Sequence, residues 1–222
     1  MGGAGANVKD AAHINPGGEW RTAKTWQPAG AVKYKLYLTA SRTLEGKPKG
    51  SGKPIAYRFD PDHPNPTLGG RNGPACIVNQ IVERADVISF MGAPLSKPLD
   101  ATGPVRVGLR VSSDRPSADF TARLIDVYPS GYAMNLAEGQ IRVESLNPRI
   151  TLGITLDLGS ASNLFEKGHR IRLDISSSSF PRLEPNPGTG ETGMWTNRVT
   201  ATNSLHFGGK FPACMELTVL PD

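Results

Sequence analysis

The chain has 222 residues, a formal net charge of +5, 25 glycines and 19 prolines. This length fits one large domain or two small ones and is sufficient to form a hydrophobic core without disulfides. Because Lys and Arg are spread along the chain and no apolar run reaches about 18 residues, the sequence favours neither nucleic-acid binding nor a membrane-spanning segment.

The first part of the chain differs in composition from the rest. Residues 1–17 are rich in small residues and lack hydrophobic periodicity, so we expect a flexible N-terminal segment followed by one domain over residues 18–222. The segment has no apolar core of a signal peptide, which makes a cytoplasmic location the expectation, although a fragment of a longer chain would look the same. We interpret Trp20 and Trp26 as aromatic anchors that cover an edge of the fold.

Alternating apolar and polar residues predict a series of half-buried strands. The clearest covers residues 103–113, where valines and a leucine alternate with arginine and glycine. Further strands are expected at residues 32–38, 55–59, 80–90, 120–128, 132–136, 150–158, 170–175 and 213–220. With no long helical period and no internal repeat, this spacing predicts an all-β fold, a two-sheet jelly-roll β-sandwich with long irregular loops.

Two segments between the strands have the composition of shaped loops. Residues 60–74 contain too much proline and glycine to join a ladder. Residues 180–195 follow the strand at 170–175 and a run of four serines, and their prolines and glycines restrict the backbone to defined turns. We therefore expect two long loops of fixed shape.

Asp60, Asp62 and His63 lie close together in the first loop and could suggest a metal site. Asp-Pro and His-Pro steps are mainly turn chemistry, and no His or Cys cluster has zinc-binding spacing. The sequence therefore predicts no metal and no cofactor. Asp60 and Asp62 are the side chains that would hold a hard cation if one binds.

A serine hydrolase needs a nucleophile on a strained turn, a histidine base and an acid. The chain has no G-x-S-x-G pattern, and the nearest segment, residues 159–163, lacks the second glycine. None of His13, His169 and His206 has the spacing of a base beside a nucleophile, and we expect His169 to bond a neighbouring carbonyl or carboxylate. The sequence therefore predicts no catalytic residue.

The remaining polar candidates have structural interpretations. Asp119 and Asp126 are separated by an odd number of positions on one strand, which places them on opposite faces. We expect them to bond turn amides or to pair with Arg123 or Arg142 rather than form a catalytic pair. Cys76 and Cys214 have no C-x-x-C partner, and we interpret them as free thiols while leaving open that the fold pairs them.

Several motifs together resemble the C-terminal jelly-roll, galactose-binding-like domain of the X-Pro dipeptidyl-peptidase and CocE/NonD serine hydrolase family. The resemblance covers residues from about 18 to 222, and its motifs are specific in combination. The matching segments are EWRTAKTWQP at 19–28, DPDHPNPTLGG at 60–70, ERADVISF at 83–90, DFTARLIDVYPSGYAMNLAEGQIR at 119–142, GHR at 168–170, SSSSFPR at 176–182 and NPGTG at 186–190.

This resemblance implies a role without catalysis. In the relatives the catalytic triad belongs to an upstream α/β-hydrolase domain, which nothing in this chain matches, so the chain would be inactive alone. The implied function is an accessory domain that packs on that catalytic domain in cis and walls its ester or peptide pocket.

The two long loops are the expected contact face, with Phe180, Arg182, Asn186 and Trp195 as interface or pocket-wall residues. Arg182 and Asn186 could instead hold only their own loop. A homo-oligomer stays open, and neither nucleic acid nor a membrane is an expected partner.

A different class of function is also compatible with the sequence. Jelly rolls of the galactose-binding type hold sugars on loops with exposed aromatic side chains. The alternative is therefore a stand-alone carbohydrate-binding module with Trp20, Trp26 and Trp195 as sugar platforms. A hydrolase with an unrecognised site is the third possibility.

Overall fold

The computed structural model describes residues 2–3, 18–67, 84–147, 150–191, 197–210 and 212–221. All regular elements in these ranges are strands, and no helix there could cross a membrane. The strands are β1 (Gly2–Gly3), β2 (Val32–Leu38), β3 (Thr43–Glu45), β4 (Ile55–Phe59), β5 (Ile88–Gly92), β6 (Leu99–Ser113), β7 (Ala118–Val127), β8 (Ala133–Val143), β9 (Leu152–Phe165), β10 (Arg170–Ser176), β11 (Ala201–Leu205) and β12 (Cys214–Leu220). The predicted all-β class is confirmed, whereas the jelly-roll connectivity stays a prediction.

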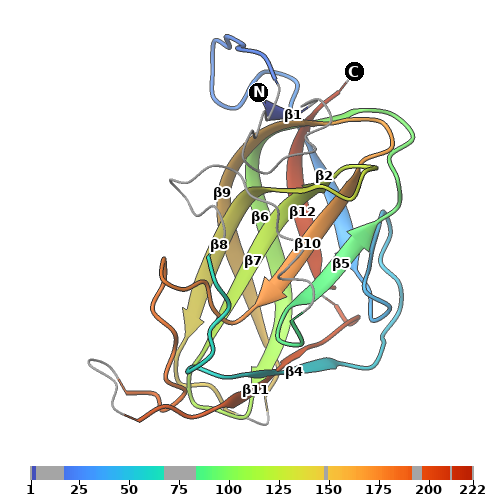
Figure 1. Cartoon of the computed structure of the whole chain (residues 1–222). Coiled ribbons are helices and arrows are strands. Elements are labelled where there is room, and N and C mark those ends of the chain that lie inside the picture. The colour runs from blue at the N-terminus through green and yellow to red at the C-terminus, as the bar shows by residue number, and fades with distance from the viewer. Residues whose placement is uncertain are drawn as a thin grey trace.

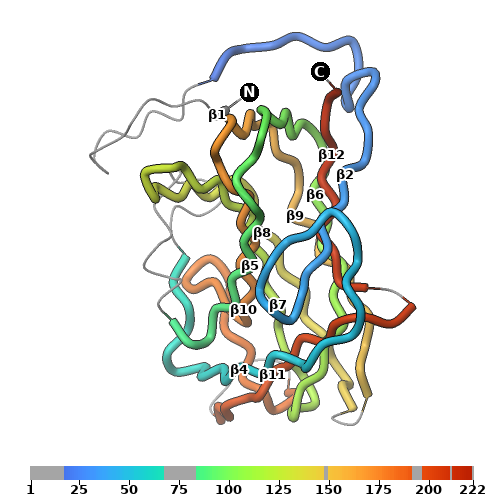
Figure 2. The backbone as a smooth tube through the Cα atoms, turned by 90° about the vertical axis from the view of Figure 1, so that its right-hand side faces the viewer, coloured from blue at the N-terminus to red at the C-terminus, as the bar shows by residue number. Residues whose placement is uncertain are grey.

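The hydrogen-bonded strand path folds back on itself to give two layers. Its order is β1-β9-β6-β12-β2-β3-β5-β10-β7-β8, with β11 joining β4 to the end of β6. Figure 1 shows β8, β7, β10 and β5 lying across β9, β6, β12 and β2, and Figure 2 gives the view from the side. The short β3 links the two layers, because it pairs with β2 on one side and β5 on the other.

The core lies between the layers and follows the predicted alternation. In β6 the side chains of Val105, Val107, Leu109 and Val111 are buried, and the residues between them face outward. Phe90, Leu124 and Leu173 are fully buried on the facing strands β5, β7 and β10, and Met215 on β12 beside β6 belongs to the same cluster of apolar side chains. Burial of this continuous apolar cluster is the main stabilising contribution to the fold.

Strand lengths differ from the predictions more than strand positions do. β6 begins at Leu99, before the strand predicted at residues 103–113, and β8 and β9 continue well beyond residues 136 and 158. Ladder irregularities explain part of this difference, because a β-bulge interrupts the alternation while the pairing goes on. Such irregularities occur at Pro104/Arg106 in the β6–β9 pair and at Leu124/Ile125 in the β7–β8 pair.

The N-terminal prediction is tested only at two residues. Gly2 and Gly3 pair in parallel with Asn163 and Leu164 of β9. Residues 4–17, the rest of the segment expected to be flexible, lie outside the described residues.

The two layers approach each other closely where β8 passes β9. A Cβ atom added at Gly139 of β8 would overlap the Asp157 carbonyl oxygen of β9 and would also touch the Leu158 Cα atom. By contrast, a Cβ atom at Gly153 of β9 would meet no atom within 4 Å. Glycine at position 139 is therefore required by this backbone contact.

We expect Gly139→Ala to lower the free energy of unfolding by about 1–3 kcal/mol, because the added methyl group must push the two strands apart. Gly153→Ala is the matched control and should leave the stability unchanged or raise it slightly, since glycine is unfavourable inside a strand. Urea denaturation of the two variants measures the difference. Equal stabilities would show that β8 and β9 are not held at this distance.

Candidate functional site

The run of four serines after β10 forms an internal hydrogen-bonding strip. The Ser176 hydroxyl contacts the Thr121 hydroxyl at 2.5 Å. The Ser177 hydroxyl contacts the Tyr57 hydroxyl at 2.9 Å and accepts a bond from the Asn203 amide at 2.8 Å. These serines are buried, and burial also raises the pKa of Tyr57. Their hydroxyl groups connect strands and are not exposed as nucleophiles would be.

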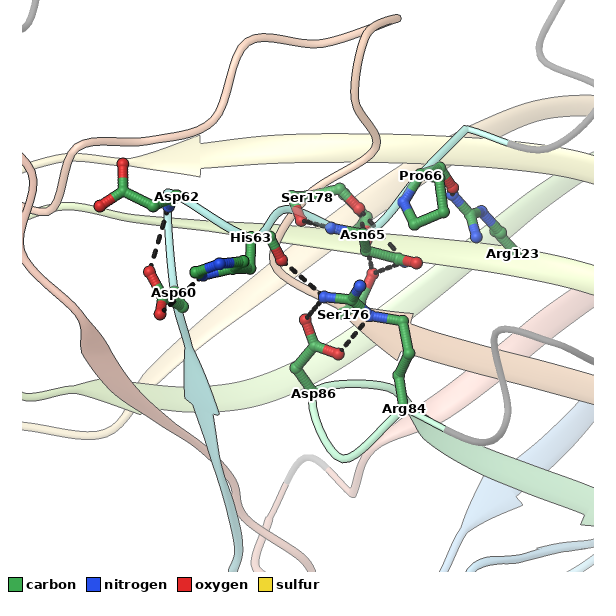
Figure 3. A network of polar contacts seen from close by, with 11 residues as sticks. Asp60, Asp62, His63, Asn65, Pro66, Arg84, Asp86, Arg123, Ser176 and Ser178 are labelled. Atoms are coloured by element: carbon green, nitrogen blue, oxygen red, sulfur yellow. Dashed lines mark hydrogen bonds and ion pairs between the residues drawn. The ribbon is translucent and has the colours of Figure 1, made fainter.

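Asn65 clamps the first long loop to this strip (Figure 3). Its side chain donates to the Ser176 hydroxyl at 3.1 Å, and its backbone N–H donates to the Ser178 hydroxyl at 2.8 Å. The Phe180 N–H donates to the Asn65 carbonyl at 2.9 Å, and the Thr67 N–H donates to the Phe180 carbonyl at 2.6 Å. The two loops predicted from composition therefore lie side by side and share a short ladder.

Beneath the loops, β7 and β8 carry buried charges. The Arg123 side chain is 3% exposed and donates to the Pro66 carbonyl and the Ser179 hydroxyl, both at 3.1 Å. Its Nε atom is 3.4 Å from Glu138 Oε1, and the Arg182 Nη1 atom is 3.2 Å from Glu138 Oε2. One buried carboxylate is thus shared by two guanidinium groups, one from β7 and one from the second loop.

Asn186 is held inside its loop and does not face solvent. The residue is buried, and its side-chain amide donates to the Ser117 hydroxyl at 2.7 Å and to Asp119 Oδ1 at 2.9 Å. Its side-chain oxygen accepts the Gly188 N–H at 2.8 Å. Asp119 also accepts two bonds from Arg142, which confirms the expected aspartate–arginine pair and raises the pKa of Arg142.

The other predicted contact residues differ in exposure. Phe180 is 47% exposed. The Arg182 side chain is 24% exposed, and its guanidinium group meets Glu138. Trp195 lies outside the described residues. Phe180 and Arg182, which only Pro181 separates in the sequence, are therefore the two predicted contact residues that are at least partly exposed among the described residues.

A hollow of about 700 Å³ lies beside this face, along the side of the sandwich where β8 and β9 meet. Glu138, Gln140, Asp157, Arg182 and Leu183 are among the residues that line it. The Arg123–Glu138–Arg182 network thus connects the covered face of β7 to an open groove.

The tryptophans at the start of the domain do not have the predicted role. Trp20 is fully exposed and Trp26 is 63% exposed, so the interpretation of both as edge anchors is wrong. The segment is instead attached through Arg21, whose Nη2 atom donates to the Thr102 hydroxyl at 2.7 Å and whose other nitrogen pairs with Asp100. This polar attachment leaves the indole rings without an apolar surface to cover.

Asp60, Asp62 and His63 form a turn. Asp60 accepts the Asp62 N–H at 3.1 Å and contacts His63 Nδ1 at 3.2 Å, and the Asp62 N–H is the main cause that lowers the pKa of Asp60. The Asp62 carboxylate pairs with Arg198 at 3.1 Å. Figure 3 shows the two aspartate carboxylates pointing apart.

Histidine contacts occur at opposite ends of the sandwich. The His206 Nε2 atom is 2.9 Å from the Ser112 hydroxyl near the end of β6. Burial is the main cause that lowers the pKa of His206, and the positive charge of Arg110 lowers it further. His169 Nδ1 is 2.9 Å from Asp126 Oδ1 near the end of β7, as expected for a histidine that begins a strand. β7 starts beside the end of β6 and runs away from it, so these two pairs do not combine into a Ser-His-Asp triad.

The thiol prediction is tested at one position. Cys214 is a half-buried free thiol, and burial raises its pKa. Cys76 lies outside the described residues, so the interpretation of Cys76 as a free thiol stays a prediction.

Sequence reasoning missed Glu138 and considered Arg123 only as a partner of Asp119 or Asp126, whereas Arg123 meets Glu138. In the alternating pattern of β7, Arg123 falls on the face expected to be wet, yet its side chain is buried. Loop residues Pro66 and Ser179 accept hydrogen bonds from it there. The available signal was an arginine in the middle of a predicted strand.

These features define a β-sandwich with a loop-covered polar face and no Ser-His-acid site among its described residues. Residues 4–215 match the X-Pro dipeptidyl-peptidase C-terminal non-catalytic domain. The chain belongs to this family, and the resemblance found in its motifs is confirmed.

Relatives of known sequence and structure agree. The chain is 33% identical to the cocaine esterase of Rhodococcus sp. over 91% of its own length but spans 40% of that esterase. An aminopeptidase from a marine sediment Thaumarchaeota archaeon has the same fold with a TM-score of 0.83 at 23% identity, over 91% of this chain and 39% of the other. An α-amino acid ester hydrolase matches with a TM-score of 0.76 at 24% identity, over 84% and 36%.

We expect Glu138→Gln to lower the free energy of unfolding by about 3 kcal/mol, because it removes the buried negative charge that Arg123 and Arg182 share. Glu184→Gln is the control, since Glu184 is exposed on the neighbouring loop. Chemical denaturation of the purified chain provides the measurement. A loss no larger than that of the control would mean that the Glu138 charge does not hold the network together.

Proposed function

We propose that this domain packs on an α/β-hydrolase catalytic domain and forms part of the wall of its ester or amide pocket. The observation that carries the proposal is the loop face, where residues 60–67 and 176–186 are fastened together above buried charges. Because the loops are already ordered in the folded domain, a partner that binds this face loses little further conformational entropy.

The loop residues fall into two groups, those that hold the loops in place and those that are exposed to a partner. Asn65, Asn186 and the serine strip are buried and hold the loops in place. Phe180 and part of the Arg182 side chain are exposed on the second loop. An exposed aromatic side chain next to an arginine is a combination that often dominates the affinity of an interface.

The substrate class follows from the relatives. Their printed names include a cocaine esterase, an α-amino acid ester hydrolase and an aminopeptidase. Ester and amide cleavage share an acyl transfer step, which the proposed catalytic partner performs with its own nucleophile. In this proposal the present chain contributes shape and contacts to the acyl or peptide pocket and no reacting group.

The proposal can be tested in a chimera in which this chain replaces the matching part of the cocaine esterase. We expect Phe180→Ala, Arg182→Ala and Trp195→Ala each to lower kcat/KM for a p-nitrophenyl ester by about tenfold, the size of effect typical of an interface hot spot. The measurement is steady-state hydrolysis by each purified variant.

Val32→Ala is the matched control for this test. Val32 is also exposed and apolar, but it begins β2 at the opposite end of the sandwich from Phe180. If all three loop variants hydrolyse the ester as fast as the Val32 variant, the proposed pocket wall is wrong. A folded chimera no more active than the catalytic part alone would also contradict it.

The exposure of two tryptophans favours a second candidate, a carbohydrate-binding module. Trp20 and Trp26 present their indole faces to solvent, as sugar platforms do. On this account the chain is retarded in affinity gels containing a polysaccharide, and Trp20→Ala, Trp26→Ala or Trp195→Ala removes the retardation. Unchanged migration across a panel of polysaccharides would eliminate this candidate and leave the hydrolase role.

A further inference from the structure

The outer face of the β2–β12–β6–β9 layer carries a second hollow, with a volume of about 400 Å³. Cys214 on β12 lies between Tyr37 on β2 and Gly108 on β6. Arg110 on β6 is paired with Gly153 on β9. The hollow therefore crosses all four strands of this layer, far in sequence from the loop face described above.

Missing side chains create this hollow. Gly108 and Gly153 occupy outward positions where the neighbouring strand residues carry side chains. A Cβ atom at Gly153 would meet nothing within 4 Å, and one at Gly108 would meet only the Cys214 carbonyl oxygen at 3.9 Å. Backbone atoms thus form much of the floor, and Tyr37 and Pro212 provide apolar walls.

The charged residues that line the hollow are both cations. Lys35 and Arg110 line it, and no carboxylate does so among the described lining residues. Arg110 is held in position, because its Nη1 atom donates to the Gly208 carbonyl at 3.0 Å and the His206 N–H donates to the Arg110 carbonyl at 2.8 Å. The remaining guanidinium donors are suited to a planar carboxylate.

Lys35 contributes a second, less constrained cation. Its Nζ atom is 3.6 Å from Glu216 Oε2, whereas Lys33 approaches the same carboxylate at 2.9 Å. Glu216 therefore pairs mainly with Lys33. Lys35 keeps the freedom to turn toward an anion in the hollow.

We infer that this hollow binds a small aromatic carboxylate. Its volume is at the lower end of the range of about 300–1,000 Å³ that ligand pockets occupy, which suits a single ring. The ring would pack against Tyr37 and the glycine floor, and the carboxylate would meet Arg110 and Lys35. An extended polyanion fits less well, because it needs a longer row of cations and would gain nothing from the apolar walls.

Benzoate is the probe, and alkylation of Cys214 by neutral iodoacetamide in the Cys76→Ser protein is the readout. Benzoate should slow this alkylation in a saturable way, since it would cover the half-buried thiol. Benzyl alcohol has the same ring without the charge and should need a concentration about tenfold higher, the effect of losing a charge-assisted hydrogen bond.

Arg110→Gln should raise the half-protecting benzoate concentration by about tenfold or more, for the same reason. Arg106→Gln is the matched control, because it removes the same charge from the same outward face of β6 while Arg106 lies outside the hollow. Gly153→Val is an independent variant, because a Cβ atom at this position meets no atom within 4 Å. Its side chain should occupy the hollow and abolish benzoate saturation-transfer signals in NMR.

Three results would overturn the inference. One is alkylation that benzoate does not slow up to its solubility limit. Another is equal protection by benzyl alcohol, which would mean that the cations play no part. The third is an equal loss of protection in the Arg106 and Arg110 variants, which would indicate general attraction of anions to a basic surface.

Discussion

Arg123 lies in an inner strand of one layer with a side chain that is 3% exposed, and its guanidinium group joins elements that are distant in sequence. It donates to Pro66 in the first loop and to Ser179 before the second, and it shares Glu138 with Arg182. A buried guanidinium group is costly unless charge and hydrogen bonds compensate it. The two loops place the Pro66 carbonyl and the Ser179 hydroxyl where they accept hydrogen bonds from this guanidinium group.

This constraint explains why the two outer faces of the sandwich differ. On the β7–β10 side, outward residues such as Asp174 and Arg172 are buried, and burial raises the pKa of Asp174 while Arg172 opposes that change. On the β6–β12 side, Arg106 and Lys35 face solvent and the sheet surface is open. The charged residues of the first face are therefore buried and paired, whereas those of the second face are exposed to solvent.

Prediction from sequence succeeded where a local pattern decides the structure. Alternation placed β6 and β10, and proline and glycine content located both loops, because these effects act over a few residues. It failed at Trp20, whose exposure depends on which surface lies nearby, and at Glu138, whose burial depends on Arg123 and Arg182. Long-range contacts of this kind leave no periodic signal, and the motif resemblance identified the family without revealing them.

The account depends on a loop face that is as rigid as the strands beneath it, and native-state hydrogen exchange measures this most directly. The Thr67 N–H, bonded to the Phe180 carbonyl, and the Phe180 N–H, bonded to the Asn65 carbonyl, are the two reporters. We expect both to be protected nearly as well as amides in the middle of β7, because opening them also breaks the Arg123 contacts. Exchange at the rate of an unstructured loop would contradict the account.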